Sequence, residues 1–336
     1  MMISNIKVKN EEISFDINND KQDFKISLVN GLRRTLISNI YVWNIDEVIF
    51  YENNSILDNE FLKKRLSLIP IKCDNNDINY ENITISLEKT NQEEYMENIF
   101  LKDFICKEDD KIIDINKLFE YPNILFAKLK NNQSIILEAK LKYNNASLGG
   151  SSYSPVVACS YKFGIDEKKV VNMKKTMNNE EISNFETQDI ERVYQKNNIG
   201  DPAYYHFSFE TNGFFQHIYL IQTAIDILIE KLKNISTEIV NKKSEKISII
   251  DNDENPDFYE FLIKDEDDTI GNILSTYILS NNNVFYSGYL IEHPLTKSIL
   301  LKIKLNDNNT LENVINIVVK TIELLINILL KLKKEF

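Results

Sequence analysis

The end of the chain constrains the fold most, because residues 311–332 form one helical pattern that is apolar around most of its surface. Lys320 and Glu323 interrupt this run, so the pattern favours a buried helix over a membrane span. One sheet can cover only one face of a helix, so a second packing partner is needed. The apolar positions are Leu311, Val314, Ile315, Val318, Val319, Ile322, Leu325, Ile326, Leu329 and Leu330.

A second broad apolar helix is expected over residues 214–240, and a narrower one over 25–40. Packing the two broad helices against each other, as across a two-fold axis, buries both surfaces most simply. We therefore expect an interface between the helices of two half-domains. Its expected residues are Leu28, Leu32, Ile221, Ile225, Leu228, Ile273, Leu274, Val318, Ile322, Leu325 and Leu329.

The chain also contains a crude internal echo. VNGLRRTLIS near the start matches IGNILSTYILS near the end, and each glycine-bearing helix is followed by strands and a long apolar helix. The pattern predicts an α+β fold with two similar half-domains packed helix to helix over antiparallel sheets. We expect residues 1–50 and 164–240 to form the N-terminal half-domain and residues 258–336 the C-terminal one.

The remaining segments have different patterns. Residues 51–163 contain short alternating runs at 83–87, 124–129 and 135–141, which predict a mostly β insert domain. Asp58 is expected to cap a short helix within it. Residues 164–201 are polar with little periodicity and read as a surface excursion with some helix, and residues 241–257 read as a linker.

Charge and cysteine content exclude some classes of protein. The 336 residues carry 39 basic and 51 acidic side chains, a net charge of −12, which argues against an autonomous nucleic-acid binder. Cys73, Cys106 and Cys159 are far apart and suggest free thiols in a reducing compartment rather than a metal site. The N-terminus lacks the apolar core of a signal peptide, so we expect no secretion.

Candidate catalytic groups are better explained structurally. His206, His217 and His293 lack a neighbouring serine or cysteine nucleophile in a suitable turn. The acidic run DNDEN at 251–255 departs from a calcium loop at its glycine and final glutamate positions. The run DEDD at 265–268 precedes a helix, so we assign Asp268 as its N-cap. The loop GGSS at 149–152 lacks the lysine of a phosphate-binding loop and reads as a tight turn.

Two adjacent arginines near the start are expected to differ in role. Arg33 falls inside the apolar arc of the 25–40 helix, and Arg34 falls outside it. An unpaired charge on the apolar side would be costly, so Arg33 is expected to form a structural ion pair within the chain. Arg34 is then either a solvated side chain or one that grips a carboxylate of a partner protein.

Several of these segments carry a family resemblance. VNGLRRTLISNI, the stretch IDEVIFYENNSILDNEFLKKRLSLIPI and SYSPVVACSYKF resemble the alpha-type assembly subunits of multisubunit RNA polymerases, which include the archaeal D-type polypeptide and the third-largest subunit of polymerase II. The segment from Phe261 to Leu305, with its D-x-T-x-G-N and H-P-L elements, resembles the small partner of that subunit, the archaeal L-type polypeptide or the eleventh subunit of polymerase II.

The resemblance implies a non-catalytic assembly platform of a DNA-directed RNA polymerase, with both partners fused in one chain. It implies docking of the two largest subunits near Arg34, Leu36, Ile37 and Ser38, contact with smaller polymerase subunits, and DNA contact only through the complex. No cofactor, metal, membrane or homodimer is expected. Such fusions resemble those of large cytoplasmic DNA viruses, which would place the protein in a viral factory in the host cytoplasm and in the virion, and otherwise with the intracellular transcription machinery.

Two other functions remain open on the sequence. The same half-domains could build a scaffold or adaptor outside transcription. A hydrolytic enzyme using a carboxylate cluster is suggested only by DEDD and DNDEN, with Asp267 and Asp268 as its testable residues.

Overall fold

The computed structural model describes residues 2–19, 24–72, 78–109, 111–241, 245–250, 258–293, 295–307 and 310–336. The chain forms two compact units. Unit 1 comprises Met1–Ile37, Val156–Glu210 and His217–Phe336, and unit 2 comprises Ser38–Pro155 with Thr211–Gln216. The start and the end of the chain therefore belong to the same unit.

The first half of unit 1, as we call it, is built from six elements. They are β1 (Ile3–Lys9), β2 (Glu12–Asn18), α1 (Ile26–Ser38), β10 (Val156–Phe163), β11 (Tyr204–Thr211) and α6 (His217–Val240). Their four strands form a sheet in the order β1-β2-β11-β10. One face of this sheet is buried, because successive residues of a strand point to opposite faces. The residues that point into the core are Ile13, Phe15 and Ile17 of β2 and every second residue of β11.

The second half of unit 1 repeats this plan. It contains β12 (Ile247–Ile250), β13 (Tyr259–Lys264), α7 (Asp268–Leu279), β14 (Val284–Leu290), β15 (Ser298–Leu305) and α8 (Leu311–Lys333), with strand order β12-β13-β15-β14. Both halves thus have the chain order strand, strand, helix, strand, strand, helix and the same sheet order. The internal echo in the sequence corresponds to this repeated topology.

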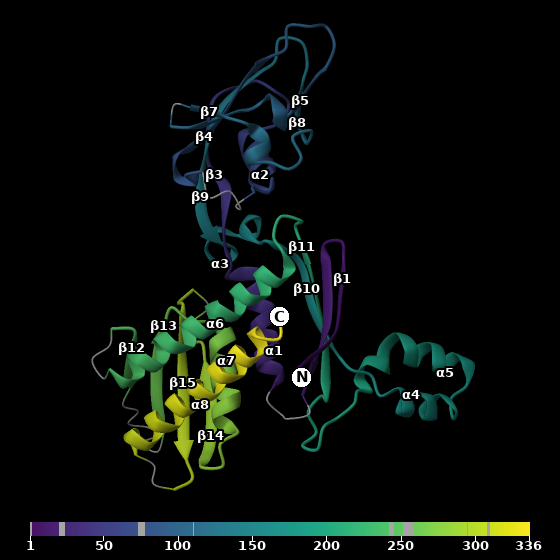
Figure 1. Cartoon of the computed structure of the whole chain (residues 1–336), viewed down its shortest axis with the longest axis vertical. Coiled ribbons are helices and arrows are strands. Elements are labelled where there is room, and N and C mark those ends of the chain that lie inside the picture. The colour runs from purple at the N-terminus through teal and green to yellow at the C-terminus, as the bar shows by residue number, and fades with distance from the viewer. Residues whose placement is uncertain are drawn as a thin grey trace. The chain divides into compact units, whose positions relative to one another are not determined.

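Helices join the two halves of unit 1. α8 packs against α6, α7 and β15, and α7 also covers β14 (Figure 1). Every apolar residue expected at the helix interface is buried, with exposed fractions of 0–2%. By length and composition α8 is also the one helix among the described residues that could cross a membrane. Its burial against two helices and a strand accounts for that apolar composition.

Unit 2 is mostly β, as expected for the insert. Its larger sheet has the order β3-β9-β4-β6-β7 and a smaller one pairs β5 with β8. Asp58 caps α2 by accepting a hydrogen bond from the Phe61 amide, as the sequence predicts. The strands are β3 (Tyr41–Asn53), β4 (Ile83–Thr90), β5 (Glu97–Phe100), β6 (Ile105–Glu108), β7 (Lys111–Ile113), β8 (Leu125–Leu129) and β9 (Ser134–Asn145), and the helices are α2 (Asn59–Ser67), α3 (Ala146–Gly149), η1 (Tyr80–Asn82), η2 (Leu101–Asp103), η3 (Ile115–Lys117) and η4 (Ser151–Tyr153).

The core of unit 2 forms where α2 covers β3 and β8. Arg65 of α2 donates hydrogen bonds to the carbonyl oxygens of Leu125 and Phe126, at 2.7 and 2.9 Å, and so fixes the helix on β8. Leu62 and Leu66 on the same helix are fully buried among the strands. The glycine loop is a tight turn, as expected, with Gly150 at a φ of 85°.

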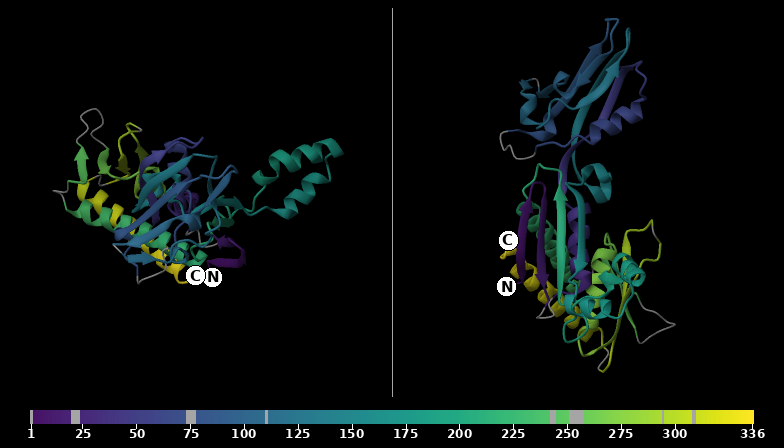
Figure 2. Two further views of the ribbon diagram at one scale, coloured as in Figure 1. Left: turned by 90° about the horizontal axis from the view of Figure 1, so that it is seen from above. Right: turned by 90° about the vertical axis from the view of Figure 1, so that its right-hand side faces the viewer.

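The polar excursion contains a helical hairpin. α4 (Glu167–Lys174) and α5 (Asn179–Asn184) are followed by the π-helical turn η5 (Phe185–Asp189) and by η6 (Ile190–Arg192) (Figure 2). Lys174 and Glu186 form an ion pair between the two arms of the hairpin. A bridge between Ile165 and Tyr194 holds the base of the hairpin together. The segment is therefore ordered by local hydrogen bonds despite its weak apolar periodicity.

The boundaries differ from those expected. The insert was expected at 51–163, but unit 2 starts at Ser38 because β3 is one continuous strand, and it ends at Pro155 because β10 joins the first-half sheet. The expected linker 241–257 contains β12, which pairs with β13 and so belongs to the second half. Residues 242–244 and 251–257, including the DNDEN run, and Cys73 lie outside the described residues.

Candidate functional site

The candidate site is the interface between the helices of the two halves, which we call the half interface. α1 and α7 approach each other closely at Gly31. A Cβ atom at this position would lie 2.6 Å from Cδ1 of Ile273 and 3.5 Å from Cγ2 of Thr269, both on α7. Glycine in the interior of a helix destabilises that helix by about 1 kcal/mol relative to alanine. Here it lets two helices from opposite ends of the chain meet backbone to side chain.

Charged side chains surround the start of α7. Arg34 of α1 donates a hydrogen bond from Nε to Oγ1 of Thr269 at 2.8 Å, and its Nη2 lies 3.4 Å from Oδ2 of Asp267. Lys231 of α6 donates to Oε2 of Glu266 at 2.8 Å. Each pair joins a cation of the first half to a carboxylate of the second half.

Further contacts link the ends of the chain. The amides of Met2 and Ile3 donate to the carboxylate of Glu335, and the rings of Phe15 and Phe336 meet edge to face at 4.9 Å. Lys333 pairs with Asp226 of α6 at 2.6 Å. The half interface therefore combines a wide apolar centre with polar contacts along its border, as is typical of permanent protein interfaces.

The N-cap of α7 lies one residue earlier than the sequence predicts. Asp267, not Asp268, has the extended backbone of a cap and accepts a hydrogen bond from the Thr269 amide at 2.9 Å. Asp268 already lies in the first helical turn, where its carboxylate accepts a hydrogen bond from the Tyr289 hydroxyl at 3.1 Å. Contiguous acids make the choice of cap ambiguous in sequence, and only the backbone conformation decides it.

The ion pair expected for Arg33 is formed by Arg34 instead. Within the described residues Arg33 forms no ion pair, and its Nε donates to Oδ1 of Asn30 at 2.9 Å. Arg34 carries the ion pair instead, with Asp267 of its own chain. Both arginines are half-buried and neither belongs to the buried face of α1, and the helical arc could not show that the acidic start of α7 lies beside Arg34.

The expected docking residues also need correction. Leu36 has an exposed fraction of 0%, because it lies on the same face of α1 as Leu28 and Leu32, and so cannot present its side chain to a partner. Arg34 is engaged within the chain. Ile37 and Ser38, at the end of α1, are half-buried. They remain the predicted docking residues.

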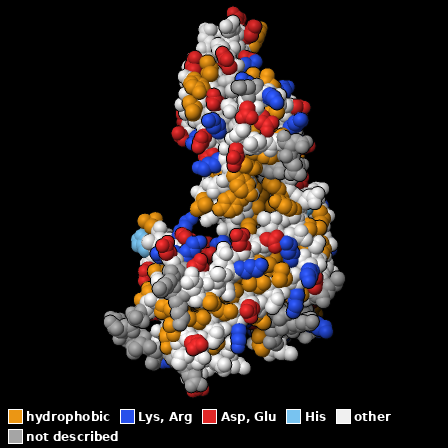
Figure 3. All heavy atoms as spheres, turned by 60° about the vertical axis from the view of Figure 1, so that its left-hand side comes forward, with side chains coloured by type: hydrophobic (Ala, Val, Ile, Leu, Met, Phe, Trp, Pro, Cys, Tyr) orange, Lys and Arg blue, Asp and Glu red, His pale blue; other side chains and the backbone are white. Residues whose placement is uncertain are grey.

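Sequence reasoning missed an aromatic cluster in unit 2. The rings of Tyr41 and Trp43 on β3 lie 5.4 and 5.2 Å from that of Tyr143 on β9, and both tyrosines are exposed. The alternation of Tyr41 and Trp43 in β3 was the available signal, but the partner on β9 is about a hundred residues away in sequence. Patches of apolar side chains are visible on the molecular face in Figure 3.

Burial and nearby charges shift the pKa values of two acidic side chains at the half interface. Burial raises the pKa of Glu266, and the nearby Lys231 offsets this only in part. Burial also acts to raise the pKa of Asp267, but hydrogen bonds from Thr269 and the charges of Lys231 and Arg34 outweigh it, so this pKa is lowered. Glu266 thus serves in an ion pair, and Asp267 serves as the helix cap and in an ion pair.

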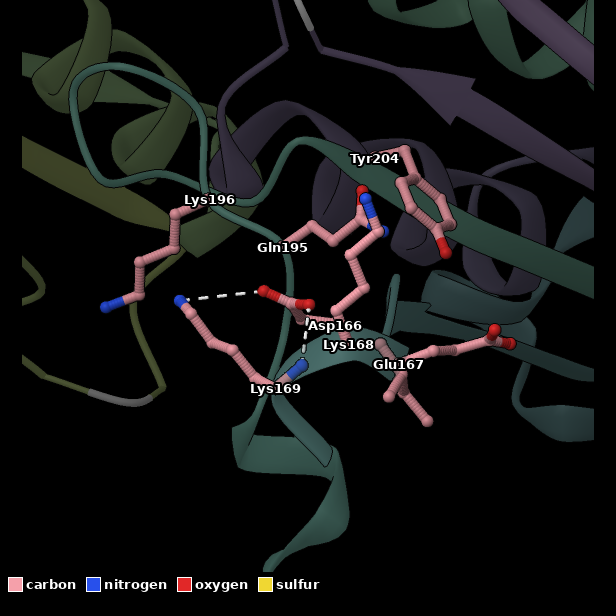
Figure 4. A pocket seen from close by; sticks show the side chains of 8 residues that line it. Asp166, Glu167, Lys168, Lys169, Gln195, Lys196 and Tyr204 are labelled. Atoms are coloured by element: carbon pink, nitrogen blue, oxygen red, sulfur yellow. Dashed lines mark hydrogen bonds and ion pairs between the residues drawn. The ribbon is translucent and has the colours of Figure 1, made fainter. Parts of the chain in front are cut away.

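Other reactive groups in the described part of the chain include two thiols, a histidine and the side chains that line one hollow. No group of three or more histidine, cysteine or acidic side chains there could hold a metal ion. Burial raises the pKa of Cys106 and of Cys159 to about 12, which favours the protonated thiol over the thiolate at neutral pH. A shallow hollow beside α4 is lined by Asp166, Lys169 and neighbours, and these two point toward each other (Figure 4). On the neighbouring strands β11 and β2, Nδ1 of His206 lies 2.8 Å from Oδ1 of Asp16.

Unit 1 thus consists of two α+β halves of the same topology that pack against each other through their helices. Two family models match the chain, both described as the RNA polymerase Rpb3/Rpb11 dimerisation domain, at residues 20–232 and 259–335. The chain therefore belongs to the family of alpha-like RNA polymerase subunits that contain this domain.

Individual relatives agree with the family models. The chain is 24% identical over 242 residues to the DNA-directed RNA polymerase subunit Rpo3 of Pyrococcus furiosus, covering 64% of this chain and 89% of the relative. It is 26% identical over 307 residues to subunit rpac1 of DNA-directed RNA polymerases I and III of Dictyostelium discoideum, covering 68% and 85%. A 72-residue segment is 42% identical to subunit rpb3 of RNA polymerase II of the same organism, covering 21% and 22%.

Asp267 gives a test of the polar border. We expect Asp267→Ala to lower the free energy of unfolding by about 1–2 kcal/mol, because it removes the cap and the carboxylate that faces Arg34. Asp267→Asn keeps a capping oxygen and should lose less. Urea unfolding of both variants measures the difference. If Asp267→Ala and the parent chain have equal free energies of unfolding, this contact does not contribute to stability.

The pH dependence separates the charge from the cap. The folded pKa of Asp267 lies below its ordinary value of 3.8, so its contribution to stability is complete above pH 3.8 and is lost as the pH falls through the folded pKa. Asp267→Asn should therefore show a weaker loss of stability in this acid range than the parent chain.

Proposed function

We propose that this chain is an assembly-platform subunit of a DNA-dependent RNA polymerase, in which both members of an alpha-like pair are fused. One observation carries the proposal. Two dimerisation domains of the same family occur in one chain, have the same order of strands and helices, and share one compact unit. A heterodimer made by two separate chains would need the same surfaces that this chain buries within itself.

The platform acts by binding rather than by chemistry. We infer that the paired halves hold a fixed surface on which the two largest subunits and smaller polymerase subunits assemble, with DNA contacted only through the complex. The end of α1 at Ile37 and Ser38 is the proposed contact with a large subunit. We further propose that the protein is viral, that it acts in the host cytoplasm and is carried in the virion, and that it forms neither a membrane-bound state nor a homodimer.

Co-expression tests the proposal directly. Together with the two largest polymerase subunits from the same genome, the chain should form one complex in equal amounts that survives gel filtration. Ser38→Arg should reduce the large subunits recovered by pull-down several-fold without changing the melting temperature. Ser183→Arg, an exposed change on α5, serves as the control.

A chain that stays alone and monodisperse beside its large subunits would contradict the proposal. That result would favour the alternative, a scaffold or adaptor outside transcription that uses the same half-domains.

A further inference from the structure

The charges at the half interface are divided by half. Arg34 and Lys231 belong to the first half, and Glu266 and Asp267, which face them, belong to the second half. Thr269 adds a hydroxyl acceptor beside Arg34. At the start of α7, the cations thus come from one half and the carboxylates from the other.

The more enclosed of these pairs is a poor source of stability. The side chains of Lys231 and Glu266 have exposed fractions of 25% and 11%. Removing a carboxylate from water is costly, and the raised pKa of Glu266 shows that Lys231 does not repay that cost in full. Apolar residues at both positions would serve stability as well. A pair of this kind is better suited to selecting partners, as buried polar groups do in coiled coils.

The repeated topology shows what other pairings would meet. Aligning Gly31 of α1 with Gly271 of α7 places Glu266 and Asp267 at the positions of Ile26 and Ser27. The same alignment places Arg34 at the position of Leu274. Two first halves would therefore bring Arg34 against Ser27 and Lys231 against Ile26. Two second halves would bring the carboxylate of Asp267 against Leu274.

We propose that the charged groups of Arg34, Lys231, Glu266 and Asp267 select the pairing of a first half with a second half and reject pairs of like halves. This inference rests on the proposed internal pairing of the halves. The recognition surface on the first half is the cationic face of α1 and α6. This face is complementary to a helix that begins with acidic residues. A second copy of the chain can then enter only by exchanging unlike halves.

Charge reversal in the full chain tests the inference. Lys231→Glu places two carboxylates together, and Glu266→Lys places two ammonium groups together. Each variant should melt about 5 °C lower than the parent chain, and the double variant should recover most of this loss. The same reversals at the exposed pair Lys162 and Glu191, with exposed fractions of 64% and 68%, should change little.

Partner choice is measured by co-expressing the two single variants with different affinity tags. Exchange of halves between them restores both ion pairs, whereas exchange between two copies of one variant restores neither. Capture through both tags in sequence should recover at least about tenfold more mixed dimer than two tagged parent chains give, since each tenfold ratio needs only about 1.4 kcal/mol.

Two results would overturn the inference. One is a double variant that melts no higher than the single variants, and the other is a yield of mixed dimer equal to that of the parent chains. Co-purification of the parent chain with the large polymerase subunits is a separate measurement, so failure of this charge selection and failure of the proposed function remain distinguishable.

Discussion

Leu325→Ala is expected to lower the free energy of unfolding of unit 1 by about 2–5 kcal/mol, which is the usual cost of an unfilled cavity in a packed core. Leu325 lies at the middle of α8 with an exposed fraction of 0%, on the helix that packs against α6, α7 and β15. The loss should appear as a lower urea midpoint with an unchanged slope.

The preceding residue of the helix is the matched control. Leu324 has an exposed fraction of 53%, so Leu324→Ala removes the same atoms from the surface of α8. We expect a change of about 0.5 kcal/mol or less. Equal effects at both positions would mean that α8 is not held by one buried face, and that the two halves do not pack through it.

Gly31→Val is expected to cost about 1–3 kcal/mol by overpacking the contact between α1 and α7. The added methyl groups would enter space held by Ile273 and Thr269. Gly31→Ala should cost far less, because the nearest atom is the movable end of Ile273 and alanine favours the helix by about 1 kcal/mol.

A second change at the contact tests its location. Ile273→Ala empties the space that valine needs, so the double variant Gly31→Val with Ile273→Ala should lose less stability than the sum of the single changes. A coupling of about 1 kcal/mol in a double-mutant cycle is expected. Strict additivity of the two changes would show that α1 and α7 do not touch at Gly31.

The long helices could be predicted from the sequence because their apolar period is unambiguous. The expected helices at 214–240 and 311–332 correspond to α6 and α8, with ends that differ by at most three residues at α6 and one at α8. The strands of the insert at 83–87, 124–129 and 135–141 correspond to β4, β8 and β9. Burial of the interface residues followed from the same periodicity.

Features that depend on distant contacts could not be predicted in this way. The pairing of Arg34 depends on the acidic start of α7, more than two hundred residues away in sequence. β12 is a four-residue strand whose identity depends on its pairing with β13. Lys231 and Glu266 each look like ordinary surface charges until α6 and α7 are placed together.

The most direct test of the internal pairing of the halves is to co-express them as two separate chains. The chain is divided between α6 and β12, within residues 241–246. This cut interrupts no described helix or strand. We expect the pieces to purify as a one-to-one complex that stays intact at about 1 μM, because the helices of the two halves bury apolar side chains against each other. Recovery of two separate, stably folded pieces with no affinity for each other would contradict the internal pairing.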